Sequence, residues 1–330
     1  MLQDWFKFTE QGTSPGKEVL AGATTWVTMA YIVAVNPSML ENAQMDFGAV
    51  FVATCLAAAF GSIFMGAVAN LPVALAPGLG LNAFFTYSIV VGMDLPWQTA
   101  LGAVFWSGVI FLILSMTGVR ERVVYAMPAS IKTGIAVGIG LFLTVIGLEK
   151  AGVIVQGEGA LLAMGDLKTW STSLFTVGFV ITIALFVRGS SVAVMAGILV
   201  VAVIAWFLDP SFGFPTSFVA LPPSLGPTFL ELEFLLPLEV GFISVILALL
   251  FVDLFDTSGT LVAVANQGGL ETEEGEILNL GRAMLADSSA TVVGALLGTS
   301  TTTSYIESTT GISAGGRTGL TSIVVGLLFL

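Results

Sequence analysis

The sequence predicts an all-α polytopic membrane protein, and three observations support that prediction. Of its 330 residues, 56% are hydrophobic and only 10% are charged, and the mean hydropathy is +0.99, well above that of water-soluble domains. From Phe47 to Met93 there is no Asp, Glu, Lys or Arg, which is enough for two crossings of about 20 residues each. The first apolar run, 19–40, is longer than the core of a signal peptide, so we expect it to be retained as a span.

The composition also excludes several functional classes. The chain has no histidine, so the usual zinc sites and catalytic imidazoles lack their ligand or base. Its single cysteine, Cys55, excludes a disulfide framework. A net charge of −12 argues against nucleic acid as a partner. We therefore expect no cofactor, no metal site, no nucleic-acid partner and no enzymatic activity, with the lipid bilayer as the surrounding medium.

Charge-poor windows predict ten complete spans and part of an eleventh. The windows lie near 19–40, 48–69, 71–92, 97–117, 126–148, 171–187, 189–208, 241–264, 283–299 and 300–316, with a further start at 318. The stretch from 318 to 330 is too short to cross a bilayer. We therefore expect a C-terminal truncation inside the eleventh span.

The few basic residues predict the orientation. All of them except Lys150 and Lys168 fall in segments on the same side as the N-terminus. Because Lys and Arg concentrate in cytoplasmic loops, the N-terminus is expected in the cytoplasm. The long loop 209–239 on the other side carries acids only, which agrees with this assignment. The expected location is the cell (plasma) membrane, which the chain crosses several times.

Two of the predicted spans are unsuited to regular helix. The third contains Pro72, Pro77, Gly78 and Gly80, and the tenth is dominated by hydroxyl side chains from 299 to 310. Backbone amides released from a helix at membrane depth must be satisfied by protein or by a water-filled cavity. Broken spans 3 and 10 are therefore expected to line the functional site.

Three acids lie where membrane helices rarely carry charge. Asp253 is near the middle of the span 243–264, Asp256 follows three residues later on the same face, and Glu307 lies in the tenth span. Each central carboxylate costs about 2.5–3.5 kcal/mol to insert, and close acids titrate as a coupled group, which suits proton binding. Structural alternatives remain open: Asp256 and Glu307 as helix caps, and Asp253 as a partner for unwound backbone.

The spacing of these elements suggests an internal duplication. The interval from the middle of the first span to Asn82 is nearly the same as the interval from Asp253 to Glu307. The two halves of the sequence would then be offset by about 225 residues. A unit of seven crossings would invert the second copy, as in many secondary transporters.

The chain resembles the AzgA-like adenine, guanine and hypoxanthine permeases of the nucleobase-cation symporter 2 group. The similarity is carried by several separated motifs in the same order: Val19 to Tyr31, Ala76 to Tyr87, Phe251 to Thr257, Thr303 to Ser308 and Gly315 to Thr321. It covers essentially the whole chain.

This resemblance implies an inverted 7+7 repeat transporter fold, like that of UraA. Spans 1–4 (residues 1–122) and 8–11 (residues 241–330) would form a core domain, and spans 5–7 (residues 123–208) a gate domain. Residues 209–240 would be an extracellular linker between the repeats. Span 11 would be incomplete and spans 12–14 missing.

The resemblance also implies a site between spans 3, 8 and 10. Asp253, Glu307, Asn82 and Gly80 match the family's substrate contacts, and Asp256 matches an acid needed for function. Phe84 is a candidate stacking face for the purine, although packing is an equal alternative. Coupling to protons would use Asp253, Asp256 and Glu307.

The leading hypothesis is therefore proton-coupled uptake of hypoxanthine, guanine or adenine by alternating access. Two alternatives with the same fold are a uracil or xanthine permease and a sulfate-carrier-like anion transporter. A membrane-embedded enzyme would need a nucleophile and base that the sequence does not offer. The residues leave open which purine is preferred, whether protons or sodium drive uptake, and whether the protein is a homodimer.

Overall fold

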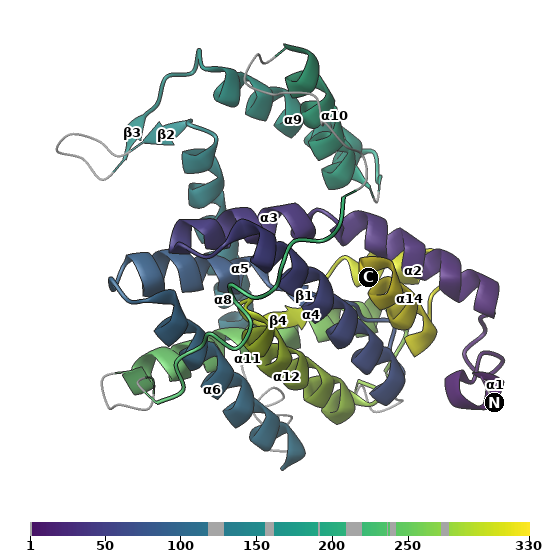
Figure 1. Ribbon diagram of the computed structural model, residues 1–330. Coiled ribbons are helices and arrows are strands. Elements are labelled where there is room, and N and C mark those ends of the chain that lie inside the picture. The colour runs from purple at the N-terminus through teal and green to yellow at the C-terminus, as the bar shows by residue number, and fades with distance from the viewer. Residues whose placement is uncertain are drawn as a thin grey trace. The chain divides into compact units, whose positions relative to one another are not determined.

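The computed structural model describes residues 2–117, 129–155, 162–190, 192–208, 220–235, 237, 242–271 and 277–330. Its contacts divide the chain into two compact units, unit 1 (Met1–Ala136 with Pro222–Leu330) and unit 2 (Val137–Leu221) (Figure 1). Six helical stretches among the described residues are long and apolar enough to cross a membrane. They are Pro15–Ala43, Phe47–Val68, Trp97–Met116, Trp170–Val187, Ile243–Gly268 and Leu280–Leu297. A polytopic helical chain is thus confirmed.

The first half of unit 1 begins with a short helix, α1 (Leu2–Phe6), followed by the first predicted span. That span is two helices, α2 (Pro15–Met29) and α3 (Ile32–Leu40), ending in a single 3-10 turn, η1 (Glu41–Ala43). Next comes α4 (Phe47–Val68), whose first turn is capped by the Asp46 carboxylate accepting from the amide of Ala49 at 2.7 Å. The same half ends with α6 (Trp97–Met116).

The region of the predicted third span is an extended segment followed by helix. It consists of β1 (Leu75–Pro77), α5 (Leu79–Ala83) and η2 (Phe84–Val91), a π-helical continuation of α5. Proline within β1 leaves one backbone position without a donor, and the wide turns of η2 mark a departure from regular α-helix that is frequent at functional sites.

The second half of unit 1 repeats this order of elements. It contains α11 (Ile243–Gly268), α12 (Leu280–Leu297), β4 (Thr302–Ser304), α13 (Ser308–Ser313) and α14 (Gly319–Phe329). The region of the predicted tenth span is therefore also an extended segment followed by a short helix.

The two extended segments pair with each other in the middle of unit 1. β1 and β4 are antiparallel, with Leu75 opposite Ser304, Ala76 opposite Thr303 and Pro77 opposite Thr302. Two further bonds lengthen the ladder, from the Gly78 amide to the Thr301 carbonyl (3.0 Å) and from the Tyr305 amide to the Ala74 carbonyl (2.9 Å). All six strand residues are buried, so each segment satisfies the backbone groups that the other leaves unpaired.

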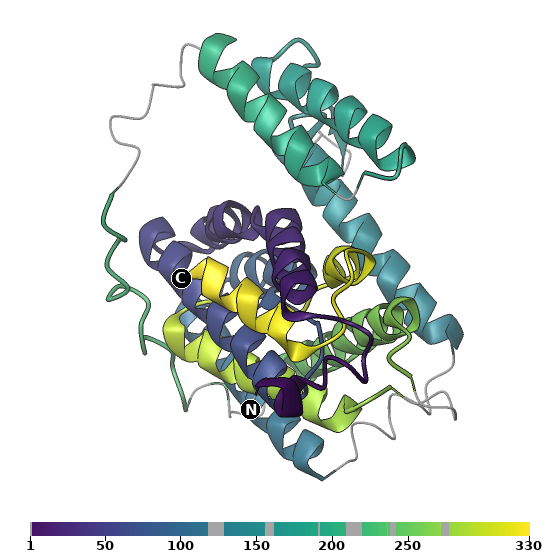
Figure 2. The same ribbon diagram turned by 90° about the vertical axis from the view of Figure 1, so that its right-hand side faces the viewer.

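Helices surround this pair in matched contacts. α14 packs along α4, and α6 packs along α12 (Figures 1 and 2). The α4 and α14 backbones touch at Gly66 and Gly319, where a Cβ on Gly66 would lie only 2.2 Å from the Gly319 carbonyl oxygen. Such close approach requires glycine.

A buried acid fixes the start of α14. The Glu18 carboxylate, on α2, accepts from the amides of Arg317 (2.8 Å) and Thr318 (3.2 Å) and from the Thr321 hydroxyl (2.6 Å). An anion at a helix N-terminus satisfies its free amides and complements its dipole. The helices α2 and α14 are joined in this way.

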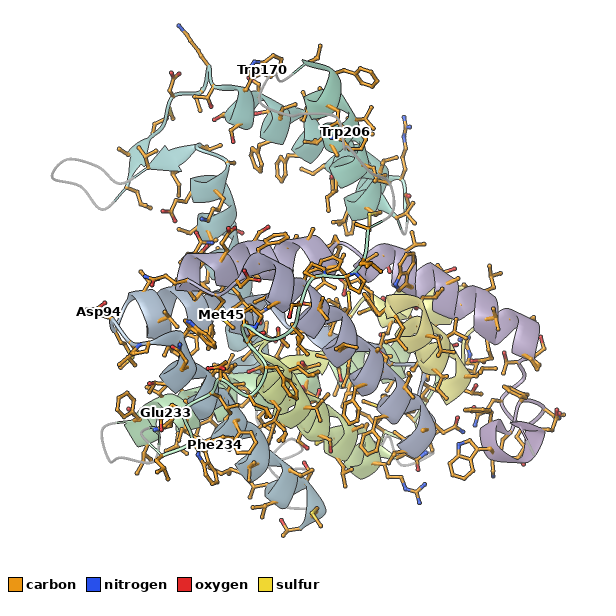
Figure 3. The ribbon with its side chains drawn as sticks, viewed as in Figure 1. Met45, Asp94, Trp170, Trp206, Glu233 and Phe234 are labelled. Carbon is orange, nitrogen blue, oxygen red and sulfur yellow. The ribbon has the colours of Figure 1, made fainter. Side chains whose placement is uncertain are left out.

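The segment from Pro222 to Leu235 runs from the start of α4, where Pro223 faces Gly48, to α6. The Trp106 indole donates to the Phe234 carbonyl at 2.7 Å, and the Glu233 amide donates to the Gln98 carbonyl at 3.0 Å (Figure 3). A further bond, from the Leu230 amide to the Leu296 carbonyl (2.9 Å), ties the same segment to the end of α12.

Unit 2 is a helical hairpin with a small β-ribbon. α8 (Ala129–Lys150) enters it, β2 (Ile154–Val155) pairs with β3 (Ala163–Met164), and α9 (Trp170–Val187) and α10 (Ala193–Leu208) follow. α9 and α10 pack on each other through small residues, since a Cβ on Gly178 would lie 2.5 Å from Val201 and one on Gly197 2.0 Å from Thr182. The outer faces of both helices carry exposed large apolar side chains, as expected for lipid contact.

Candidate functional site

The candidate site lies in unit 1, where the paired strands turn into helices. After β1 the chain enters α5 at Gly78, and after β4 it enters α13 at Glu307. Gly78 is required by a close approach, because a Cβ there would lie 2.6 Å from the Thr303 methyl carbon. The same added Cβ would lie 3.8 Å from Oδ2 of Asp256, so α11 contributes an acid at this point.

The acids of this region fall into two groups, and the first is fully enclosed. Asp253, on α11, is 1% exposed, and Asp287, on α12, is 0% exposed. The Thr257 hydroxyl lies between them, 2.9 Å from Oδ2 of Asp287 and 3.4 Å from Oδ1 of Asp253. Asp287 also accepts from the amide (3.1 Å) and hydroxyl (3.2 Å) of Ser304, which fixes β4 against α12.

The second group, Asp256 and Glu307, is only half-buried. Oε1 of Glu307 accepts a hydrogen bond from the Tyr31 hydroxyl at 2.7 Å, and Asp256 interacts electrostatically with both Glu307 and Asp287. Tyr305 lies within the same electrostatic environment and donates its hydroxyl to the Pro77 carbonyl at 2.5 Å. Both carboxylates are therefore only partly covered by protein.

Asn82 belongs to a different, completely buried network. Its side-chain amide donates to Oδ1 of Asn36 at 2.5 Å, and its side-chain carbonyl accepts from the Ser300 hydroxyl. Asn36 in turn donates to the hydroxyls of Thr54 (2.7 Å) and Thr299 (2.9 Å). This network joins α3, α4, α5 and the segment before β4. Asn82 thus has hydrogen bonds to protein on both of its polar atoms.

The remaining predicted site residues lie on α5 and η2. Gly80 is half-buried in the first turn of α5. Phe84 is half-buried and packs against the apolar cluster formed by α3, α4, η2, α6 and α11, whereas Phe85 is fully enclosed within it. Phe84 is therefore only partly covered by protein.

The sequence analysis missed Asp287, Tyr31 and Asn36. Asp287 lies inside the predicted span 283–299, so the argument that singled out Asp253 applies to it equally. Tyr31 had no such signal, because its importance comes from the break between α2 and α3, which brings its hydroxyl to Glu307. Among the described residues no group of three or more acidic or cysteine side chains could hold a metal ion.

Comparison with solved structures identifies the class of protein. The fold matches the transmembrane domain of a cyanobacterium bicarbonate transporter, BicA, with a TM-score of 0.68, covering 95% of this chain and 80% of that one at 14% identity. It also matches the murine Solute Carrier 26 family member A9 anion transporter in its inward-facing state, with a TM-score of 0.63, covering 95% and 55% at 11% identity. At these identities the likeness concerns the fold alone, which is that of a polytopic membrane transporter.

Comparison of sequences identifies the family. The sequence model of the Permease family (Xan_ur_permease) matches residues 16–330, and the chain belongs to that family. It is a permease rather than an enzyme, and the predicted resemblance is confirmed.

Three curated relatives align with the whole of this chain, and the alignments cover about three quarters of each relative's length. A protein of Methanocaldococcus jannaschii called "Putative permease MJ0326" is 48% identical, with 75% of its length covered. The adenine permease AdeP of Escherichia coli is 46% identical, with 74% covered. The guanine/hypoxanthine permease PbuG of Bacillus subtilis is 46% identical, with 77% covered.

Proposed function

We propose that this protein carries purine nucleobases, such as hypoxanthine, guanine or adenine, across the cell membrane. The relatives at 46% identity are named adenine and guanine/hypoxanthine permeases, which supports this substrate class. The observation that carries the proposal is the pair of half-buried acids at the ends of the two extended segments: Asp256 beside the start of α5 and Glu307 at the start of α13.

The chemistry of a purine suits these groups. Carboxylates accept hydrogen bonds from ring N–H groups and exocyclic amines. The Tyr31 hydroxyl donates to Oε1 of Glu307. This hydrogen bond fixes the orientation of the carboxylate and therefore the direction of Oε2. The free amides at the start of α5, beside Gly80, are suited to a ring nitrogen or a carbonyl oxygen of the base. Phe84 is suited to stacking on the ring.

We assign the enclosed acids a different part in transport. Asp253 and Asp287 both lie within hydrogen-bond distance of the Thr257 hydroxyl. Two buried carboxylates that lie beside the same hydroxyl favour sharing a proton. In this proposal Asp253, Asp256 and Glu307 couple proton binding to purine binding, and Asp287 holds β4 in place for that coupling.

The contacts within unit 1 support an inverted repeat. Exchanging α4 with α12 and α6 with α14 converts the α4–α14 packing into the α12–α6 packing. The same exchange turns the β1–β4 pair into itself, because an antiparallel pair is self-complementary. We propose that the residues of unit 1 form the core domain of a 7+7 repeat, that those of unit 2 belong to the gate domain, and that alternating access moves one against the other.

The proposed site takes all its residues from one chain, so it needs no residue from a second copy. The N-terminus is proposed to lie in the cytoplasm, on the side that carries Arg282 and Arg317. A cysteine introduced at Gly12, in a Cys55→Ser background, tests this orientation: it should react with membrane-impermeant reagents only after the cells are opened.

Uptake of radiolabelled hypoxanthine by cells that express the protein tests the function. Glu307→Gln and Asp256→Asn should each abolish uptake while the protein still reaches the membrane in normal amounts. Asp46→Asn, at the start of α4, is a matched control that removes an acid away from the site and should retain uptake. Full uptake by the Glu307 variant would refute the assignment.

A further inference from the structure

A cavity of about 400 Å³ opens in unit 1 away from the acids of the candidate site. Its wall is formed by the N-terminal segment, the end of α4, the loop that precedes α12 and the residues that precede α14. Three basic residues, Lys7, Arg282 and Arg317, line it together with Trp5, Asn70 and Asn279. None of these residues takes part in the proposed purine site.

The described lining of this cavity carries three basic residues and one acid, Glu10. Lys7 pairs with Glu10 at 3.0 Å, and both are exposed. Neither Arg282 nor Arg317 forms an ion pair with a described acid. Arg317 is held in position because its Nη1 donates to the carbonyls of Ile312 (2.8 Å) and Gly316 (2.7 Å). The guanidinium groups of Arg282 and Arg317 therefore line this cavity without an ion pair to a described acid.

The start of α12 adds to this excess of positive charge. Arg282 lies in the first turn of this 18-residue helix; that turn contains no acid, and the helix has no side-chain cap. Asn279, in the capping position, donates instead to the Ala69 carbonyl at 3.0 Å, at the end of α4. A helix N-terminus favours an anion, and an arginine there is unfavourable on its own. An anion bound in the cavity would compensate both.

We propose that this cavity binds a phosphate-bearing anion through the guanidinium groups of Arg282 and Arg317. The planar guanidinium donates two parallel hydrogen bonds to phosphate oxygens, and the free amides of α12 add donors of the same kind. Two sources offer this chemistry: the headgroup of an anionic phospholipid, and a small phosphorylated solute. The basic residues of the cavity lie on the side expected to face the cytoplasm, where both are abundant.

A competing explanation is that acids of the chain itself neutralise the arginine residues of the cavity. Glu273, Glu274 and Glu276 precede α12 in the sequence and lie outside the described residues. If these acids neutralise Arg282, removing them should create an anion site that the native protein lacks. If the proposal holds, their removal should leave anion binding essentially unchanged.

The test measures thermal unfolding of the purified full chain in two arms. In detergent, inorganic phosphate is titrated at constant ionic strength against chloride. In lipid nanodiscs, phosphatidylglycerol is compared with phosphatidylcholine. We expect one of these to raise the Tm of the native protein, and which one does so identifies the source of the phosphate. The variant is Arg282→Gln, whose side chain is exposed, and the control is Arg188→Gln, an exposed arginine after α9.

For Arg282→Gln, about tenfold more ligand should be needed to give the same rise in Tm, as expected for loss of a charge-assisted bidentate contact. Arg188→Gln should show the native rise in Tm. Three results would overturn the proposal. One is the absence of any shift in either arm, and another is an equal shift in both arginine variants. The third is phosphate binding that appears only in the triple variant E273Q/E274Q/E276Q.

Discussion

The hydroxyl of Tyr31 donates to Oε1 of Glu307 over 2.7 Å, although 276 residues separate them in the sequence. Tyr31 is available for this bond because α2 ends at Met29 and α3 begins at Ile32, so that the first span is broken beside the start of α13. The bond fixes one oxygen of the proposed purine-binding carboxylate and so directs the other.

Removing this hydroxyl should weaken purine binding without unfolding the protein. Tyr31→Phe keeps the ring and loses one hydrogen bond to a charged group, so we expect KM for hypoxanthine to rise about tenfold while maximal uptake stays near native. Uptake measured over a range of hypoxanthine concentrations checks this. A native KM for Tyr31→Phe would contradict the proposed role of this hydrogen bond.

Asp287 should matter for stability as well as for transport. Asp287→Ala would leave the Ser304 amide and the Ser304 hydroxyl without their shared acceptor in a fully buried place. Each unsatisfied buried donor costs about 1–3 kcal/mol, so Tm in detergent should fall by several degrees. Asp166→Ala, an exposed acid of unit 2, is the control and should leave Tm unchanged. A native Tm for Asp287→Ala would contradict the proposed role of this acid.

Asn82 and Glu307 should respond differently to substitution. Asn82→Ala removes the hydrogen bonds to Asn36 and Ser300. We expect it to lower the free energy of unfolding by about 1–3 kcal/mol, measured as a lower Tm. Glu307→Gln, at a half-buried position, should abolish uptake and preserve Tm. If Asn82→Ala instead keeps its Tm and loses uptake, Asn82 contacts the purine directly and the buried network is secondary.

The crossing of α4 and α14 should tolerate no side chain. In Gly66→Ala the new Cβ would lie 2.2 Å from the Gly319 carbonyl oxygen, so the two helices would have to separate. Overpacking of this kind costs about 1–3 kcal/mol. Gly140→Ala in α8, where a Cβ would meet no atom within 4 Å, should be neutral or slightly stabilising. Equal Tm values for the two variants would contradict this packing.

The positions of the membrane helices follow closely from the sequence. The windows 48–69 and 97–117 correspond to α4 (Phe47–Val68) and α6 (Trp97–Met116), because long apolar runs bounded by polar residues carry their own length signal. The prolines and glycines before Asn82 likewise signalled an interruption. What the sequence did not contain is the pairing of β1 with β4, since three-residue strands over 200 residues apart leave no local pattern.

The sequence predicted only part of the candidate site, because the rest of it depends on contacts between distant segments. Asp253, Asp256 and Glu307 were found because charge is costly at membrane depth. Which of them is enclosed depends on how α11 is turned toward α12, and this leaves Asp253 enclosed and Asp256 half-buried. Asn36 and Tyr31 depend on contacts between distant segments and had no signal of their own.

The most direct test of the central claim is competition for uptake of labelled hypoxanthine by cells that express the protein and lack other purine carriers. The account predicts that unlabelled adenine, guanine or hypoxanthine suppresses the signal, that sulfate and bicarbonate do not, and that the signal is lost in Glu307→Gln. Suppression by sulfate or bicarbonate with no effect of any purine would contradict it.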